Sequence, residues 1–287
     1  MGAVFRKEMK IYTGGMFGYF IMALLLLFMG LFVTLFNLLS GYADLSYALS
    51  GMHWVLIVLI PFLTMRSIAE ERHSKTDQLL YSLPLRMRDV VLGKFLAMAV
   101  LFGIPTAVSA LYPVLLSMVG EFSLASSYAA LLGYFLLGLS MIALCTFLSS
   151  LVENQIVAAV ISIAALLLLY FMDMVTAILP TSPLASLLIL IAVELGVALL
   201  LWASTKNMGL CIAAAVLLLL PTVLTYLINA GLFDSLIGNF LHAADPFARY
   251  NGFTYGHIDL NAILFYLSFS AFFLFATVRV MEKRRLA

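Results

Sequence analysis

The chain has 287 residues, of which 64% are apolar and 10% are charged, and its formal net charge is +1. Soluble domains carry about 25% charged residues, so this composition excludes an ordinary water-soluble globular protein. It predicts an integral membrane protein, because a bilayer is the solvent that tolerates so much apolar surface. No nucleic-acid partner is expected.

Three basic residues, Arg6, Lys7 and Lys10, precede the first apolar run, residues 17–39. This run is longer than the apolar part of a secretory signal peptide, and no small-residue cleavage site follows it. We therefore interpret 17–39 as a first membrane-spanning helix.

Further apolar runs of about 20 residues, the length that crosses a bilayer as a helix, follow along the chain. Helices are expected because a helix satisfies its own backbone hydrogen bonds in lipid one segment at a time. The predicted fold class is an all-α integral membrane protein with about eight transmembrane helices in a single domain, 1–287. The predicted spans are 17–39, 47–65, 92–119, 127–148, 155–179, 184–203, 208–228 and 260–281.

The basic residues are sorted by side of the membrane. An even number of spans places both termini on one side, and of the 15 Lys and Arg residues all except Arg249 fall on that side. Lys and Arg concentrate in cytoplasmic loops. We therefore expect both termini, the 66–94 loop and the 149–154 connection to be cytoplasmic.

Several catalytic motifs are absent from the sequence. It contains no Gly-x-x-x-x-Gly-Lys-Ser/Thr phosphate loop, no His-Glu-x-x-His zinc motif and no Gly-x-Ser-x-Gly nucleophile elbow. Cys145 and Cys211 lie inside apolar runs, and the histidines are scattered, so no metal-ligand spacing arises. We expect the chain not to be an enzyme by itself and to bind no metal or cofactor.

The 66–84 stretch, "RSIAEERHSKTDQLLYSLP", is charged at its start and apolar at its end. Thr76 is suited to cap a short helix, in which Leu79, Leu80 and Leu83 share one face, and Pro84 would end that helix. Such an amphipathic helix at the membrane surface either meets anionic lipid or docks a soluble partner, and the physics alone does not choose between them.

The longer run "MRSIAEERHSKTDQLLYSLPLRMRDVVLGKFLA" resembles the cytoplasmic signature of ABC type-2 (ABC-2) exporter permeases. Lys75 stands where that family usually has glycine, and Gln78 where it has glutamate. The matching residues are Glu70, Glu71, Arg72, Thr76, Leu79, Leu80, Pro84 and Lys94.

The resemblance continues on both sides of this loop. "FRKEMKIYTGGMFGYFIMALLLLFMGLF" is similar to the family's N-terminal interfacial helix and first span, and "SSLVENQIVAAVIS" to its connection between spans four and five. The C-terminal stretch from His242 resembles the gliding-motility-type branch. Residues 184–231 are not covered, which implies a six-span core with an inserted helical hairpin at 184–231.

This resemblance implies a permease subunit of an ATP-binding cassette exporter. ATP and Mg would be bound by a separate ATP-binding subunit, which would dock on a coupling helix in the 66–94 loop. Other implied partners are a second permease, identical or related, and an accessory membrane protein, in the cell membrane (inner or plasma membrane) of a bacterium. The implied docking residues are Glu70, Glu71, Arg72, Thr76, Leu79, Leu80, Ser82 and Pro84, with a second cytoplasmic contact at Glu153, Asn154 and Gln155.

Two further acidic residues lie within predicted spans. Glu194 falls midway along 184–203 and Asp173 near the outer end of 155–179. A carboxylate inside a membrane is costly and is a candidate functional residue. A protonated or paired acid between helices is also compatible with Glu194, and for Asp173 a side chain that reaches the membrane interface is the favoured alternative. The alternative function is therefore a stand-alone secondary transporter or channel-like protein that uses these acids; a third is a structural membrane partner that docks the ATPase and moves no solute.

Overall fold

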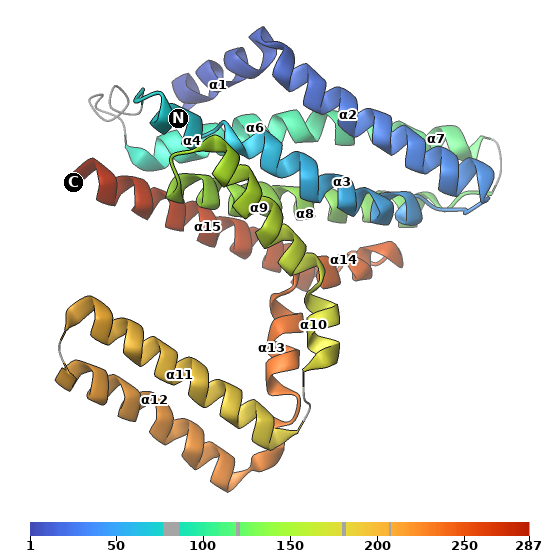
Figure 1. The fold of residues 1–287 in the computed structure, drawn as a ribbon. Helices are drawn as coiled ribbons and strands as arrows, with labels where there is room; N and C mark the ends of the chain where they lie inside the picture. The colour runs from blue at the N-terminus through green and yellow to red at the C-terminus, as the bar shows by residue number, and fades with distance from the viewer. Residues whose placement is uncertain (77–85, 119–120, 180–181, 207, 287) are drawn as a thin grey trace. The chain divides into compact units, whose positions relative to one another are not determined.

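The computed structural model describes residues 1–76, 86–118, 121–179, 182–206 and 208–286, and all regular elements among them are helices (Figure 1). The all-α prediction is thus confirmed for this part of the chain. The chain divides into two compact units, Met1–Leu169 with Arg249–Ala287 (unit 1) and Tyr170–Ala248 (unit 2).

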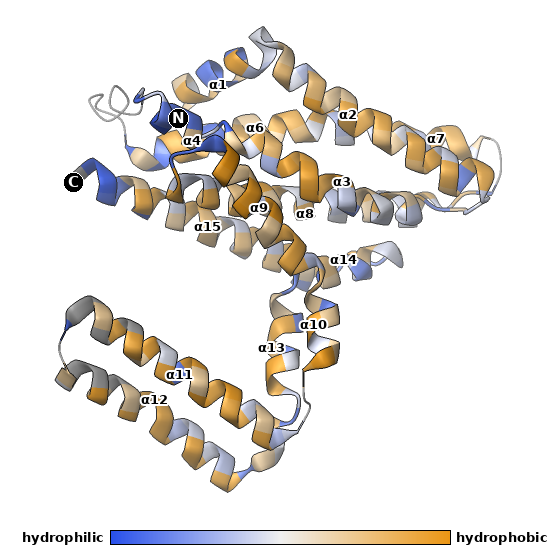
Figure 2. Cartoon of the chain, viewed as in Figure 1, coloured by the Kyte–Doolittle hydropathy of each residue, from blue (hydrophilic) through white to orange (hydrophobic). Residues whose placement is uncertain are grey.

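Unit 1 is a bundle of long apolar helices with shorter helices at their ends (Figures 1 and 2). Its central element is α8, which packs against α3, α6, α7 and α15. Gly138 of α8 permits one of these close contacts, because a Cβ atom there would overlap the ring of Phe102 on α6. The helices are α1 (Gly2–Gly14), α2 (Met16–Val33) with its π-helical end η1 (Thr34–Leu39), α3 (Ser46–Met65), α4 (Ala69–His73), α6 (Met87–Ser109), α7 (Leu111–Ser117), α8 (Leu124–Leu151), α9 (Gln155–Tyr170), α14 (Pro246–Thr254), which begins in unit 2, and α15 (Leu260–Leu286).

The N-terminal helix α1 is separate from the first span. Gly15 has an extended conformation and interrupts the helix between α1 and α2. The turn is close enough that a Cβ atom on Gly18 would overlap the carbonyl group of Tyr12. Helix α1 therefore folds away from α2 and lies beside α6.

Five helices are long and apolar enough to cross a membrane, or up to six if α9 and α10 (Met172–Ile178) form one broken span, by length and composition among the described residues. The five are Met16–Leu39, Ser46–His73, Met87–Ser117, Leu124–Leu151 and Leu260–Arg285. The predicted continuous helix over 155–179 is wrong in one respect, because the helix breaks at Phe171 between α9 and α10. No glycine or proline in 155–179 marks this break.

Unit 2 contains α10, the helices α11 (Pro183–Thr205) and α12 (Met208–Ile228), the short η2 (Ala230–Phe233) and α13 (Leu236–Ala244). Helices α11 and α12 pack against each other as a hairpin. Their described apolar segments, Pro183–Leu199 and Ala215–Ile228, are shorter than the five long spans. The total of eight spans and the insertion at 184–231 stay predictions.

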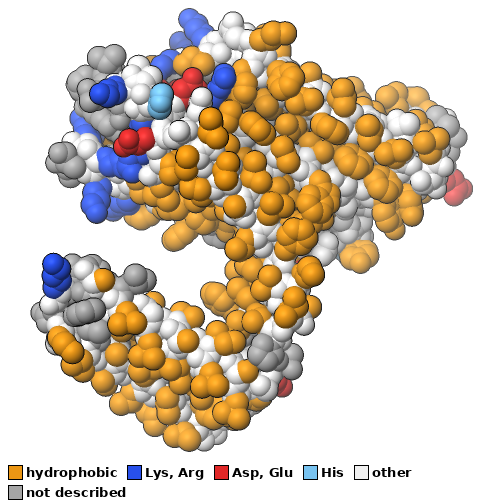
Figure 3. Space-filling view, viewed as in Figure 1, with side chains coloured by type: hydrophobic (Ala, Val, Ile, Leu, Met, Phe, Trp, Pro, Cys, Tyr) orange, Lys and Arg blue, Asp and Glu red, His pale blue; other side chains and the backbone are white. Residues whose placement is uncertain are grey.

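The charged residues of unit 1 gather at one end of its helices. The last turns of α15 reach the end of α8, where the guanidinium of Arg284 donates to the carbonyl of Leu151 at 3.0 Å. Helix α1 and helix α4 lie at the same end, so both chain ends and the 66–76 segment meet there (Figure 1). Figure 3 shows Lys and Arg side chains clustered over this end, whereas apolar side chains cover the rest of the unit's visible face.

Candidate functional site

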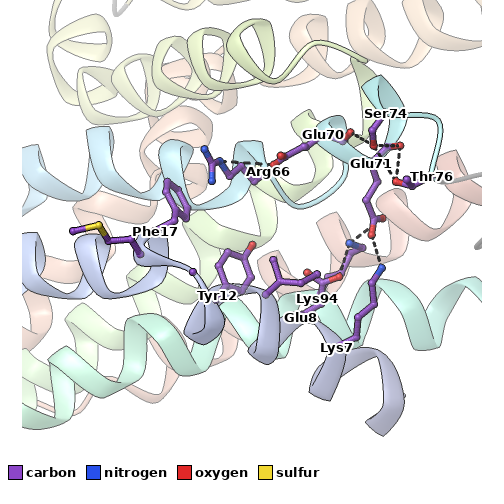
Figure 4. A pocket seen from close by; sticks show the side chains of 13 residues that line it. Lys7, Glu8, Tyr12, Phe17, Arg66, Glu70, Glu71, Ser74, Thr76 and Lys94 are labelled. Atoms are coloured by element: carbon purple, nitrogen blue, oxygen red, sulfur yellow. Dashed lines mark hydrogen bonds and ion pairs between the residues drawn. The ribbon is translucent and has the colours of Figure 1, made fainter.

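The charged end of unit 1 is organised around Lys94, a cation inside an otherwise apolar stretch of α6. Its side chain is 1% exposed. Its ammonium group lies 2.8 Å from Glu8 Oε1 and 3.0 Å from Glu71 Oε2 (Figure 4). It also donates to the carbonyl of Ser67 at 2.7 Å. An ammonium group has three N–H donors, so these three acceptors satisfy it completely.

Glu8 reaches Lys94 because of the periodicity of α1. The buried residues of this helix are Val4, Glu8 and Tyr12, which recur every four residues and so form one face. That face packs on α6. A carboxylate in the middle of an otherwise apolar face would be costly without a partner, and Lys94 is that partner.

Lys7 adds a second cation to the same group. Its Nζ atom lies 3.0 Å from Glu71 Oε1, so Glu71 bridges Lys7 and Lys94 with its two oxygens. Burial acts to lower the pKa of Lys7, but the hydrogen bond to Glu71 and the charges of Glu71 and Glu8 outweigh it and raise this pKa above its ordinary value. Lys7, Glu8, Glu71 and Lys94, which we call the charge network, carry two positive and two negative charges.

Arg72 fastens α4 to α8. One guanidinium nitrogen, Nη1, donates to the carbonyls of Ser150 at 2.8 Å and Val152 at 3.1 Å. The backbone N–H of Ala69 donates to the hydroxyl of Ser149 at 3.2 Å. The carbonyls at the end of a helix lack intrahelical donors, so Arg72 supplies donors where α8 ends. The 66–76 segment and the 149–155 turn, predicted as two separate partner contacts, therefore touch each other.

Other residues in and next to α4 are exposed to solvent. The side chain of Glu70 is 49% exposed, with Arg66 3.7 Å away on the same side. Ser74, Lys75 and Thr76 are exposed, and Thr76 donates from its hydroxyl to the carbonyl of Glu71 at 3.1 Å. Thr76 thus closes the end of α4.

Lys75 has a left-handed backbone, with φ of 58°. This conformation costs an L-residue with a Cβ atom roughly 1–2 kcal/mol and costs glycine little. Glycine, the residue expected at this position from the resemblance, would adopt the conformation of Lys75 at little cost.

A cavity of about 670 Å³ lies between α1, the start of α2 and the α3–α4 region. Figure 4 shows Tyr12 and Phe17 on one side of it, and Glu70, Glu71, Ser74 and Thr76 on the other. Arg66 lies over the ring of Phe17, 4.2 Å from its centre. Burial, with the nearby acidic side chains adding to it, raises the pKa of the Tyr12 phenol well above its ordinary value. The charge network lines part of this cavity, and its ion pairs are intact there.

The structure gathers part of the predicted docking set. Glu70, Glu71, Arg72 and Thr76 lie together; Glu71 and Arg72 are half-buried in contacts with neighbouring helices, and Glu70 and Thr76 are exposed. Four other predicted residues lie outside the described residues, as does the helix predicted after Thr76. They are Leu79, Leu80, Ser82 and Pro84.

The second predicted contact is a short turn between α8 and α9. Glu153 and Asn154 are exposed, and Gln155 is half-buried. The side-chain oxygen of Asn154 accepts a hydrogen bond of 2.8 Å from the N–H of Ile156. Asn154 is therefore the N-cap of α9, which gives it a structural role whether or not a partner touches it.

The two predicted intramembrane acids are not brought together by any contact among the described residues. Glu194 is buried, and the hydroxyl of Thr222 donates to its Oε2 at 3.2 Å, which joins α11 to α12. Asp173 is exposed in the first turn of α10, where the helix dipole favours a carboxylate. Among all the residues that the structure describes, no group of three or more His, Cys, Asp and Glu residues has metal-binding geometry.

Sequence reasoning missed Lys7 and Glu8 and did not assign Lys94 a site role. One signal was present, because a lysine flanked by apolar residues in a span requires a partner. The identity of that partner was not readable, since Glu8 is 86 residues away in the sequence.

Comparison with protein families gives one match, to a family described as ABC-2 family transporter protein, over residues 32–228, which is more than half of the chain. Comparison with curated proteins gives no match. The matched residues include Glu71, Arg72 and Lys94, whereas Lys7 and Glu8 lie before them. The likeness of the C-terminal stretch to the gliding-motility-type branch lies outside the match and stays a prediction.

Proposed function

Because the chain belongs to the ABC-2 family of transporter proteins and is thus a multi-pass membrane component of an ABC transporter, we propose that it is the permease subunit of an exporter powered by a separate ATPase. That ATPase docks on the 66–84 segment from the cytoplasm and binds ATP and Mg, for which this sequence has no phosphate loop. The chain itself is not an enzyme and binds no cofactor in this proposal.

The observation that carries the proposal is the way α4 is held. Glu71 fastens it to α1 and α6, and Arg72 fastens it to α8, while Glu70, Ser74 and Thr76 remain exposed. A lipid-surface helix needs no such anchoring. A docking element does, because force from a partner moves the spans only if the element is rigidly joined to them.

The anchoring also defines the route of coupling. A displacement of α4 acts on α6 through Lys94 and on α1 through Lys7 and Glu8, and it acts on α8 through Arg72. Buried ion pairs and packed helices have discrete arrangements and deform little, so they transmit rigid-body motion. We propose that Glu71 and Arg72 position α4 and that Glu70, Thr76, Leu79, Leu80, Ser82 and Pro84 meet the ATPase.

The proposed orientation is supported by the distribution of charge. The cations of α1, α4, α6 and α15 gather at one end of unit 1, and such an end faces the cytoplasm. We propose eight spans, with α11 and α12 as an inserted hairpin, in the cell membrane of a bacterium. The assembly contains a second permease, identical or related, and an accessory membrane protein, and Glu153, Asn154 and Gln155 form a second contact with the ATPase.

The test is co-purification with the ATP-binding subunit from native membranes. The parent chain is compared with Glu70→Arg, which reverses an exposed charge on α4, and with Leu79→Asp/Leu80→Asp. Glu121→Arg is the matched control, because Glu121 is an exposed acid in the connection that precedes α8, at the opposite end of that helix from Arg72.

We expect an ATPase to accompany the parent and Glu121→Arg, and to be lost from the other two variants, each verified as folded by size-exclusion chromatography. If the folded parent purifies without an ATPase, the exporter proposal is wrong. A stand-alone transporter would then be tested next, with Glu194→Gln and Asp173→Asn as the first variants.

A further inference from the structure

A second concave surface lies on unit 1 between the start of α6 and the C-terminal part of α15, with a volume of about 490 Å³. Its lining residues come from one face of each helix. On α6 they begin at Arg88 and continue three and four residues later with Val91 and Leu92, and on α15 they run from Ala271 to Glu282 at the same spacings. We call this surface the α6–α15 groove.

The walls of the groove are fixed by packing. Val91 and Leu274 are buried members of a cluster that joins α1, α6, α8, α15 and the residue before α4, and Leu92 and Val278 pack against that cluster. One side of each of these side chains packs against the cluster, and the other side lines the groove. The groove is therefore a formed apolar surface.

Charge and hydrophobicity are ordered along the groove. Arg88 lies in the first turn of α6 and Arg279 near the C-terminal end of α15, which is the charged end of unit 1, whereas Leu274 and Phe275 lie further from that end along α15. The eight-residue separation of Ala271 and Arg279 corresponds to about 12 Å along a helix axis. A ligand that fills the groove must therefore be anionic at one end and apolar at the other.

The two arginines leave the groove with a positive excess. Arg279 pairs with Glu282 at 3.3 Å and lies 4.8 Å from the centre of the Phe275 ring. Among the described residues, no carboxylate lies within ion-pair distance of Arg88, and Glu282 is the one acid that lines the groove. An exposed pair such as Arg279–Glu282 contributes little stability, so Arg279 can exchange Glu282 for a phosphate at small cost.

We propose that the α6–α15 groove binds one anionic phospholipid, with its phosphate at Arg88 and Arg279 and an acyl chain along Leu92, Leu274 and Phe275. Guanidinium groups match the geometry of phosphate oxygens, and basic pockets between spans bind anionic lipid headgroups. A soluble anion would leave the apolar walls unused, and a zwitterionic lipid would leave the positive excess uncompensated. This inference does not depend on the ATPase.

The experiment is native mass spectrometry of the full chain, released from nanodiscs that contain equal amounts of phosphatidylglycerol and phosphatidylethanolamine. The variant is Arg88→Gln/Arg279→Gln, at two exposed positions. The matched control is Lys10→Gln/Lys75→Gln, which removes the same charge from exposed positions at the same end of unit 1. A third variant, Val278→Trp, fills the groove and leaves its charges unchanged.

We expect the parent and the control to retain one phosphatidylglycerol in preference to phosphatidylethanolamine. Occupancy should fall about tenfold in the arginine variant and also fall in folded Val278→Trp. Equal retention of both lipids, an equal loss in the control, or displacement by inorganic phosphate would overturn the proposal. So would efficient disulfide-linked dimerisation of Phe275→Cys in native membranes, because a second copy of the chain would then cover the groove.

Discussion

Lys94 and Glu8 are 86 residues apart in the sequence and form an ion pair of 2.8 Å between buried side chains. The pair fastens the N-terminal helix to α6. Because Lys94 also contacts Glu71, the same ammonium group joins α1, α4 and α6 at one point. The position of α4 is therefore set by α1 as well as by the spans on either side of it.

Replacing Lys94 by methionine should strongly destabilise the chain. The substitution keeps the length of the side chain but leaves Glu8 buried without its Lys94 partner and leaves Glu71 with Lys7 alone. Breaking a buried pair in this way costs about 3–5 kcal/mol. The measurement is thermal unfolding in detergent. Adding Glu8→Gln should recover part of the loss, since it removes one uncompensated charge.

Lys10→Met is the control for this substitution, because Lys10 is an exposed lysine of α1. An equal unfolding temperature for Lys94→Met and Lys10→Met would contradict a structural role for the charge network.

Replacing Arg72 by alanine should loosen the 66–76 segment and the 149–154 turn together. Hydrogen bonds to a charged group contribute about 1.5–3 kcal/mol each, so local opening should become at least about tenfold more frequent. Hydrogen–deuterium exchange of peptides from the two segments measures this. Arg86→Ala, an exposed arginine just before α6, should leave both segments unchanged; the same protection in Arg72→Ala as in the parent would show that Arg72 does not hold α4.

Lys75→Gly should stabilise the end of α4. Glycine adopts the left-handed conformation of Lys75 without the cost of roughly 1–2 kcal/mol, and part of that gain is lost to the greater freedom of glycine in the unfolded chain. The expected readout is slower proteolysis in the 66–76 segment. Ser74→Gly is the control, because Ser74 has an ordinary right-handed conformation, and it should be neutral or destabilising; equal effects of the two glycines would contradict the prediction.

Asp245 should make stability depend on pH. Burial raises the pKa of this carboxyl to about 6, with backbone N–H groups opposing the rise and the charge of Asp173 adding to it. A raised pKa means that the folded state favours the protonated acid. The contribution to the free energy of unfolding is therefore complete below about pH 4 and is lost as pH rises through about 6, by up to about 3 kcal/mol.

Thermal unfolding of Asp245→Asn between pH 4 and 8 tests this. Asparagine can still accept the hydrogen bond that Asp245 receives from the N–H of Phe247, so the variant should match the parent at pH 4 and exceed it at pH 7. Asp259→Asn, which alters a partly exposed aspartate that accepts the corresponding bond from Asn261, serves as the control. Parallel pH profiles for the parent and Asp245→Asn would contradict the assignment.

Local patterns in the sequence were sufficient to place several of the long helices. The predicted 208–228 helix coincides with α12, and 47–65 differs from α3 by one residue at its start. A long apolar helix is recognised by the number of consecutive apolar residues, and this number can be counted from a short stretch of sequence. The separate N-terminal helix followed from resemblance to a known family, and the paired glycines at Gly14 and Gly15 are compatible with the break that separates it from α2.

The break at Phe171 and the partners of Lys94 were decided by the tertiary structure. The 155–179 run carries no residue that breaks a helix, so its composition predicted a continuous span. Lys94 required a carboxylate, but the sequence contains 14 acidic residues, and the choice of Glu8 and Glu71 depends on α1 packing its buried face on α6. The sequence by itself determined where the long apolar helices lie, because hydropathy is summed residue by residue. The tertiary structure alone decided which charges meet, because an ion pair requires two groups within about 4 Å and helix packing sets that distance.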